Sequence, residues 1–322
     1  MDFLVSIVYP MRSAVIGALL FGIAAGGAFG KLGQAAPQSS PTQNAQAEQE
    51  SARAKFIASV PQGFQVPPEG DDVANRLLAY YGAVFVARGG ATPPPVVMFA
   101  DEDAVTDWQA SLMTGKTTVN KTVVELQSVA LGAFVAARTE AQANKLDITP
   151  FGTDPAKRDY QDTIKLWKSR VDPALQHWVS AGRLEAKEAQ RIRILPPAEQ
   201  VSEVFHLEDR GLFFAKNFSR TILSSVSPPG ASQHISMLAV DINEYQIAAV
   251  RAILAKHGWY QTVLLDTPHF TYLGVSEQEL HALGLHKVNV DGSDYWIPEL
   301  GISVDKLLDR RPQPAGRAAR NN

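Results

Sequence analysis

The spacing of apolar residues along the chain predicts a mixture of helices and short strands. Helical spacing predicts helices over 75–81, 101–113, 122–144 and 165–178, and an amphipathic helical region over 184–205 that two prolines interrupt. Short apolar runs predict buried strands over 83–86, 96–99, 238–240 and 263–265. These signals place helices and strands in both halves of the chain.

Turn and capping signals organise the C-terminal part of the chain. Residues 243–257 have apolar side chains at helical spacing and predict a helix packed on a sheet. A Ser-x-x-Glu capping box at 276–279 predicts a short helix over 276–283. The Asp-Gly pair at 291–292 predicts the turn of a β-hairpin over 287–298. We therefore expect two helices and then a hairpin after residue 242.

The N-terminal part contains a long uncharged apolar stretch. Residues 13–30 carry no charged side chain and lie between Arg12 and Lys31. Their length suits either the core of a cleaved signal peptide or a membrane anchor, and both interpretations send the rest of the chain across a membrane. A buried helix of the folded protein is the remaining alternative, which the five glycines of the stretch disfavour. We therefore predict an exported protein.

Composition and pattern divide the chain into five parts. We predict a signal peptide or anchor over 1–31, a flexible linker over 32–50, an N-terminal α/β extension over 51–135, the functional domain over 136–300 and a disordered tail over 301–322. The extension carries no chemistry of its own that we can recognise. We therefore expect it to pack against the functional domain.

Composition and charge narrow the function classes. The chain has 322 residues, of which 45% are hydrophobic and 20% charged, an ordinary globular composition. Its net charge of −3 gives no electrostatic basis for nucleic-acid binding, and no run of lysine and arginine is interleaved with aromatic residues. Cysteine is absent, which excludes thiolate metal ligands and a cysteine nucleophile and is compatible with the cell envelope.

Three residues of types that bind zinc follow one another in the C-terminal part of the chain. His234, Asp241 and His269 supply imidazole and carboxylate ligands, and a catalytic zinc site uses three such ligands and leaves a fourth position open. Seven residues separate His234 from Asp241, so the chain must bend between them if both are to face one ion. Pro268 argues against a helix and predicts a kink that turns Asp266 and His269 toward one point.

Each of these residues also has an ordinary structural interpretation. A histidine beside an apolar run is usually a structural residue. Asp241 precedes the predicted helix and can cap it, and Asp-x-Pro-His at 266–269 also fits a turn. The spacing alone therefore leaves two possibilities open, a metal site and a set of unrelated structural residues.

Two motifs around these residues resemble those of a known family. The sequence SQHISMLAVD at 232–241, preceded by Pro-Pro-Gly at 228–230, resembles the S-x-H-x-x-G-x-A-x-D signature of the zinc D-alanyl-D-alanine carboxypeptidases of VanY type. The sequence DTPHFTYLG at 266–274 resembles the second signature of that family, E-P-W-H-F-R-Y-V-G. Two separate motifs in the same order make this resemblance specific.

This resemblance implies that His234, Asp241 and His269 bind one Zn²⁺ ion and that Asp266 is the catalytic acid and base. It covers roughly 140–274 and implies an α+β fold, in which a small antiparallel sheet carries the zinc site and helices pack around it, as in hedgehog and DD-peptidase proteins. The functional domain would be a zinc metallopeptidase that hydrolyses the D-alanyl-D-alanine amide of a peptidoglycan stem peptide. Its place would be the bacterial cell envelope, in the periplasm or on the outer face of the inner membrane, with membrane contact only through the N-terminal segment.

Further residues are implied in substrate binding. Arg158 lies in RDYQDT at 158–163, which is similar to the family's Y-R-S-Y-x-x-Q element, although Thr163 stands in place of the glutamine. The arginine of that element binds substrate carboxylate or the developing oxyanion, a task that suits the planar guanidinium fork. An arginine on the first turn of a surface helix is the alternative. Ser232 is implied as a hydrogen-bonding residue for substrate, and Arg220 is a second candidate for substrate contact.

The sequence also departs from the family pattern, which keeps other functions open. Met237 stands where the family has glycine, so the bend must be made without a residue that is free at positive φ. Asp266 replaces the commoner glutamate, and peptidoglycan endopeptidases that cut L-Ala-D-Glu bonds share this residue. An endopeptidase and a non-catalytic zinc protein of the hedgehog kind are therefore alternatives on the same site. A serine hydrolase built from Ser232, His234 and Asp241 is a further alternative, disfavoured because no Gly-x-Ser-x-Gly elbow is present.

Overall fold

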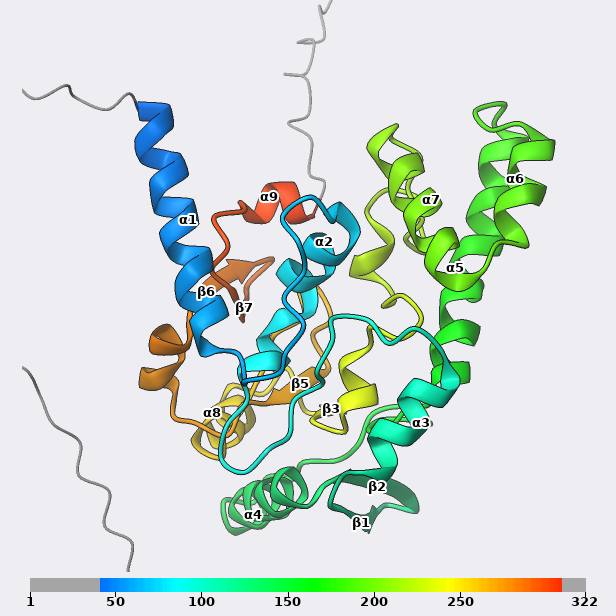
Figure 1. Cartoon of the computed structure of the whole chain (residues 1–322). Coiled ribbons are helices and arrows are strands. Elements are labelled where there is room, and N and C mark those ends of the chain that lie inside the picture. Colours follow the sequence, from blue (N-terminus) through cyan, green and yellow to red (C-terminus); the bar gives the residue numbers. More distant parts are fainter. Residues whose placement is uncertain (1–40, 309–322) are drawn as a thin grey trace, which may run out of the picture. The chain divides into compact units, whose positions relative to one another are not determined.

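A computed structural model describes residues 41–308 of the chain, and their side chains from residue 50 onward. The α-helices are α1 Pro41–Ser59, α2 Asp72–Tyr81, α3 Glu102–Ala110, α4 Ser128–Ala143, α5 Tyr160–Ser180, α6 Ala186–Arg193, α7 Pro197–Asp209, α8 Ala248–Lys256 and α9 Val304–Leu307 (Figure 1). The 3₁₀-helices are η1 Gly82–Val86, η2 Ile222–Ser224, η3 Gln233–Ser236 and η4 Glu277–Leu283. The strands are β1 Thr114–Val119, β2 Thr122–Gln127, β3 Ala239–Asp241, β4 Trp259–Tyr260, β5 His269–Tyr272, β6 Leu285–Val290 and β7 Ser293–Pro298.

The strands of the described residues form three small antiparallel sheets. Two are hairpins, β1 with β2 and β6 with β7, and the third has the strand order β3-β5-β4. In this third sheet β5 is central, and all four of its residues are buried. Its register places Asp241 of β3 opposite His269 of β5. With helices packed around these short sheets, the protein is a mixed α and β structure that is compatible with the α+β class.

Two glycines allow the ends of α8 and β5 to pack at backbone contact. Gly258 follows α8 at a φ of +79°, and a Cβ on it would lie 3.0 Å from the Cα of Gly274. The backbone N–H of Leu273 donates to the carbonyl of Gly258 at 2.8 Å. Only glycine combines positive φ with such a close approach, so this contact fixes how α8 lies against the sheet that carries the site.

One hydrophobic core runs through most of the described residues. It extends from Phe56 in α1 to Leu308 after α9. The α2 helix and η1 pack on β7, and α4 packs on α8, so the region predicted as an N-terminal extension packs against the region predicted as the functional domain (Figure 1). The predicted boundary at residue 136 falls inside α4, and all described residues belong to one compact unit.

Several predicted helices are confirmed. Those expected at 75–81, 101–113 and 165–178 correspond to α2, α3 and α5. The region expected at 184–205 forms α6 and α7, and Pro197 is the first residue of α7. A proline loses no intrahelical hydrogen bond at that position, which is why α7 can begin at Pro197.

The capping box and the hairpin near the C-terminus are also confirmed. The side chain of Ser276 accepts from the helix backbone, and Glu279 accepts from the N–H of Ser276, at the start of η4. The β6–β7 hairpin turns at Asp291 and Gly292, which both have positive φ. Short-range turn chemistry was sufficient to predict both features.

Other predicted elements are wrong. Residues 122–144 do not form one helix, because 122–127 are strand β2 and α4 begins only after it. Asn120 and Lys121 both have positive φ and form the tight turn between β1 and β2, a turn for which the sequence has no glycine signal. The helix predicted over 243–257 is shorter, since 243–246 form a turn before α8.

Three predicted strands are also wrong. Residues 83–86 lie in η1, 96–98 form bends and 263–265 form a bend and a turn. Short apolar runs such as these indicate burial without specifying strand. Each of the three is largely buried, but none pairs with a neighbouring strand in the described part of the chain.

The predictions for the chain ends are tested only in part. Residues 1–40 and 309–322 lie outside the described residues, and with them the predicted signal or anchor and most of the predicted tail. The predicted linker over 32–50 is helical from Pro41 onward, as the first half of α1. Among residues 41–308, no helix is both long enough and apolar enough to cross a membrane.

Candidate metal centre

The structure brings the three predicted ligands together. His234 lies in η3, Asp241 ends β3 and His269 begins β5 beside it. His234 Nε2 and His269 Nδ1 each lie 3.3 Å from Asp241 Oδ1, and the two nitrogens lie 3.1 Å apart. The two histidines are only 2% and 3% exposed. The three atoms therefore form a nearly equilateral triangle at the edge of the β3-β5-β4 sheet.

The predicted bend between His234 and Asp241 is made by Met237. Met237 has a φ of 56° and follows η3 in the left-handed conformation, although it is not a glycine. Its N–H donates to the carbonyl of His234, and its own carbonyl accepts from the N–H of Gln127 at 3.0 Å. Its side chain is 1% exposed. The bend is therefore made without a glycine, as expected, because burial and these hydrogen bonds hold a methionine at a positive φ where glycine would be easiest.

Hydrogen bonds on the outer side of each imidazole fix which nitrogen faces the triangle. His234 Nδ1–H donates to the carbonyl of Ala156 at 2.7 Å, which leaves Nε2 without a proton in the neutral ring. His269 Nε2–H donates to Gln233 Oε1 at 2.8 Å, which leaves Nδ1 without a proton. Asp241 Oδ1 is buried and accepts no hydrogen bond from the described residues. With both rings neutral in these tautomers, three lone pairs converge with no proton between them.

Gln233 is a functional residue that the sequence analysis missed. Its Nε2 donates to the carbonyl of Tyr81 at 2.8 Å, so its Oε1 must be the atom that faces His269. The hydroxyl of Thr271 also donates to Gln233 Oε1, at 2.5 Å. Partners of this kind orient metal-binding histidines and fix their tautomer. The position directly before His234 in the first motif carried no recognisable signal, because the partners of Gln233 come from distant parts of the chain.

The triangle fits a zinc ion. A tetrahedral zinc with bonds of about 2.0–2.1 Å holds its ligand atoms about 3.3–3.4 Å apart, close to the separations seen here. Burial, with a contribution from the positive charge of Arg158, lowers the pKa of His234 from 6.5 to about 4. Burial opposes the ionisation of Asp241, but His234 and His269 outweigh it and hold the pKa of its carboxyl below the ordinary value. Neutral imidazoles and an ionised carboxylate are the forms that bind zinc, so this group can hold a metal ion.

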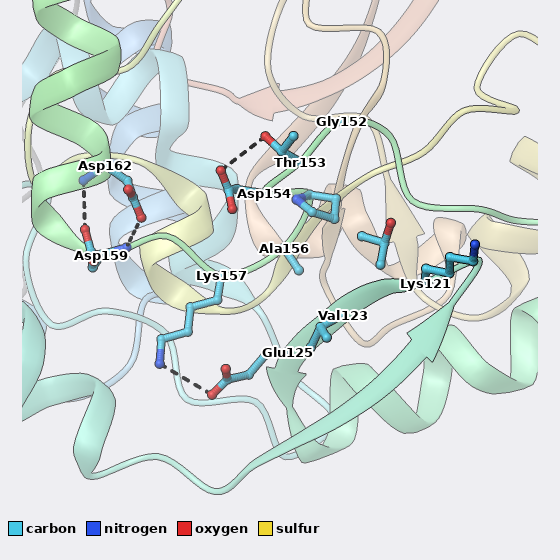
Figure 2. Close-up of a pocket in the computed structure, with 12 residues that line it drawn as sticks. Lys121, Val123, Glu125, Gly152, Thr153, Asp154, Ala156, Lys157, Asp159 and Asp162 are labelled. Carbon is cyan, nitrogen blue, oxygen red and sulfur yellow. Dashed lines mark hydrogen bonds and ion pairs between the residues drawn. The ribbon is translucent and has the colours of Figure 1, made fainter.

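Arg158 contacts a ligand of this group. Its Nη2 donates to Asp241 Oδ2 at 3.2 Å, so the two oxygens of Asp241 have different partners. The capping box of Asp159 and Asp162 starts α5 directly after Arg158, and Lys157 pairs with Glu125 on β2 (Figure 2). Arg158 is therefore held between two anchored neighbours. The structure places it where it orients Asp241, a role that the sequence analysis did not assign to it.

Asp266 lies on the wall of the same pocket. This pocket has a volume of about 180 Å³ and is lined by the three ligands, Asp266 and Arg158. A turn holds Asp266 in place, since its N–H donates to the carbonyl of Val263 and its carbonyl accepts from the N–H of His269, each at 3.2 Å. Asp266 is exposed to the pocket, but the surrounding protein limits the solvation of its carboxyl and so raises its pKa. His269 opposes this rise in the pKa, and the charge of Asp241 adds to it.

Ser232 and Arg220 differ in their relation to the site. Ser232 also lines the pocket, and its hydroxyl accepts from the backbone N–H of His234 at 3.3 Å, as the cap of η3. Both ring nitrogens of His234 already have other partners, which removes the base that a Ser232 nucleophile would need. Arg220 lies 4.0 Å from Asp291 and does not line the pocket.

Comparison of the chain with protein-family models, with curated proteins and with solved structures finds no match. The assignment of a function therefore depends on the residues of the site. Among the described residues, His234, Asp241 and His269 form one group that can bind a metal ion. The pocket beside this group contains one further carboxylate, Asp266, and two arginines, Arg158 and Arg170, which limits the chemistry that the site can perform.

Proposed function

We propose that this chain is a zinc-dependent peptidase that removes the terminal D-alanine from peptidoglycan stem peptides. The observation that carries the proposal is the convergence of three unprotonated ligand atoms, at 3.1–3.3 Å from one another, on the wall of an open pocket that also contains Asp266. A purely structural cluster would place a proton between neighbouring acceptor atoms. A metal site leaves them bare and adds a nearby acid or base.

Zinc bound by His234, Asp241 and His269 would supply Lewis-acid activation of water and of the scissile carbonyl. Asp266 then takes the proton of the attacking water and returns it to the leaving amine, a task that suits a carboxyl whose pKa is raised. Arg158 keeps Asp241 oriented through its contact with Oδ2. Its charge also faces the pocket, where it favours a developing negative charge on the substrate.

The choice of substrate is supported by the resemblance of the two motifs to those of the VanY-type carboxypeptidases. It is also supported by the size of the pocket, since about 180 Å³ suits the small end of a peptide better than a large side chain. Such a substrate lies outside the cytoplasmic membrane. The proposal therefore requires export, for which the uncharged stretch at 13–30 is the candidate signal.

The test pairs metal analysis with an assay of released D-alanine. We expect the purified protein to release D-alanine from a peptide ending in D-alanyl-D-alanine, to lose this activity in a chelator and to regain it with zinc. Release of larger fragments from purified muropeptides, without free D-alanine, would assign the site to an endopeptidase instead. Stoichiometric zinc without hydrolysis of any of these peptides would contradict peptidase activity and support a non-catalytic zinc protein.

A further inference from the structure

Helix α5 brings a second arginine to the pocket of the metal centre. Leu166 and Arg170 are four residues apart on this helix and therefore share a face, and both line the pocket. Thr163 lies on the same face, and its hydroxyl accepts from the N–H of Gly230 at 3.3 Å. This contact holds the start of the helix against the chain that leads into the first motif. Arg170 is thereby placed at the pocket by a rigid element.

The two arginines of the pocket have different partners. Arg158 is paired with the carboxylate of Asp241 and belongs to the metal centre. Arg170 Nε donates to the hydroxyl of Ser225 at 2.7 Å, and one of its terminal nitrogens donates to the hydroxyl of Ser169 at 2.8 Å. Both partners are neutral, and no acidic side chain among residues 50–308 forms an ion pair with Arg170. Arg170 is thus a half-buried positive charge that has no acidic partner among the described residues.

Three serine hydroxyls line the same pocket as this charge. They belong to Ser224 at the end of η2 and to Ser225 and Ser227 in the segment that follows it. The hydroxyl of Ser225 accepts from Arg170 and so aligns the guanidinium. A planar guanidinium next to hydroxyl donors is the arrangement that binds a carboxylate, because the fork pairs with both oxygens and the hydroxyls satisfy the remaining lone pairs.

We propose that Arg170, with the hydroxyls of Ser224, Ser225 and Ser227, binds the C-terminal carboxylate of the substrate. The inference rests on the proposed function and deepens it, because it selects substrates whose chain ends inside the pocket. A volume of about 180 Å³ leaves room for a small terminal residue between this charge and the metal ligands. An endopeptidase must let the chain continue and gains nothing from a cation at this place. Arg170 therefore specifies carboxypeptidase over endopeptidase activity.

The experiment compares two peptides that differ only at the C-terminus, one ending in D-alanyl-D-alanine as the free acid and one as the amide. The variants are Arg170→Gln and Arg170→Lys, and Lys168→Gln is the matched control, because it removes an exposed positive charge from the same helix outside the pocket. Zinc content and thermal unfolding are measured for every variant. Calorimetry with the metal-free proteins gives the affinity for the free acid and for the amide independently of hydrolysis.

We expect the wild-type protein and Lys168→Gln to prefer the free acid. Arg170→Gln should lose on the order of 10–100-fold in kcat/KM for the acid, mostly through KM, with little change for the amide and with full zinc content. Arg170→Lys should keep part of the preference, because it keeps the charge and loses the fork. Equal losses on acid and amide, or no loss, would overturn the assignment.

The outcome also separates this inference from the proposed function. If the zinc-loaded wild-type protein hydrolyses neither peptide, the peptidase proposal fails, and the calorimetry decides the role of Arg170. Tighter binding of the acid than of the amide, lost in Arg170→Gln and kept in Lys168→Gln, would still establish a carboxylate site. Equal binding of both peptides, or no binding of either, would overturn it.

Discussion

Replacing Gln233 by leucine tests the structural basis of the metal centre without touching a metal ligand. Leucine has a similar size but offers neither the amide oxygen that accepts from His269 Nε2–H nor the amide group that donates to Tyr81. His269 then loses the hydrogen bond that fixes its tautomer and ring orientation. We expect weaker zinc binding, although all three ligands are still present.

The size of the effect follows from the contacts that are lost. Loss of an orienting partner of a metal-binding histidine costs about 10–100-fold in metal affinity. The change also leaves the buried carbonyl of Tyr81 and the Nε2–H of His269 without their present partner, at about 1–3 kcal/mol each in the free energy of unfolding, and the hydroxyl of Thr271 loses one of its partners. We therefore expect both weaker zinc binding and a less stable fold.

Gln200→Leu is the control that separates these two effects. Gln200 is also a buried glutamine, which accepts from Trp167 Nε1–H at 2.9 Å and donates to the carbonyl of Ile192 at 2.8 Å, away from the metal centre. Zinc affinity is measured by competition with a chromophoric chelator, and stability by chemical denaturation. Wild-type affinity in Gln233→Leu would refute the reasoning, and so would an equal loss of affinity in Gln200→Leu.

Three further predictions concern the acid, the charge state of a ligand and the lead-in to the first motif. Asp266→Asn should lower kcat by on the order of 10²–10⁴-fold while zinc content stays unchanged, measured by D-alanine release and metal analysis. In the metal-free protein, burial holds the pKa of His234 at about 4, so between pH 6.5 and pH 4 this imidazole is protonated in the unfolded chain and stays neutral in the folded protein. The free energy of unfolding should therefore fall by up to about 3 kcal/mol as the pH drops from 6.5 to 4, measured by denaturation at each pH. Gly230→Ala should lower the free energy of unfolding by more than about 1–3 kcal/mol, because Gly230 has a φ of +79° and a Cβ would collide with the carbonyl of Phe99. Gly152→Ala, at a φ of +83° with no atom near the added Cβ, should lower it only by the conformational strain.

Each of these predictions has a result that contradicts it. Full turnover in Asp266→Asn would exclude this residue as the acid and base. An unchanged pH slope in a His234→Gln variant would show that another group causes the loss of stability. Equal costs for Gly230→Ala and Gly152→Ala would mean that the backbone contact at Gly230 does not contribute to the position of the first motif.

The ligands of the site could be predicted from sequence because each lies in a local motif. The order of His234, Asp241 and His269 is fixed by two short segments, and the need for a bend between the first two follows from the alternation of a strand. The orientation of the imidazoles could not be predicted in this way. It depends on Ala156 and Gln233, whose positions relative to the rings are set by tertiary contacts between segments far apart in the chain.

The fold shows the same division. Capping and turn residues predicted η4 and the β6–β7 hairpin, because their signals act within four residues. The β1–β2 hairpin was missed, because its turn uses Asn120 and Lys121 at positive φ without a glycine. The apolar runs at 83–86 and 263–265 predict strands that do not form, because apolar composition indicates burial and only pairing with a neighbouring strand makes a sheet.

The most direct test of the account is the metal content of the purified protein and of single-histidine variants after exhaustive dialysis. The account predicts one zinc ion per chain in the wild-type protein and in His257→Ala, whose histidine contacts Glu140 away from the site, and none in His234→Ala or His269→Ala. A wild-type protein that retains no zinc, or a His269→Ala variant that keeps a full equivalent, would contradict the central claim that these residues bind one metal ion.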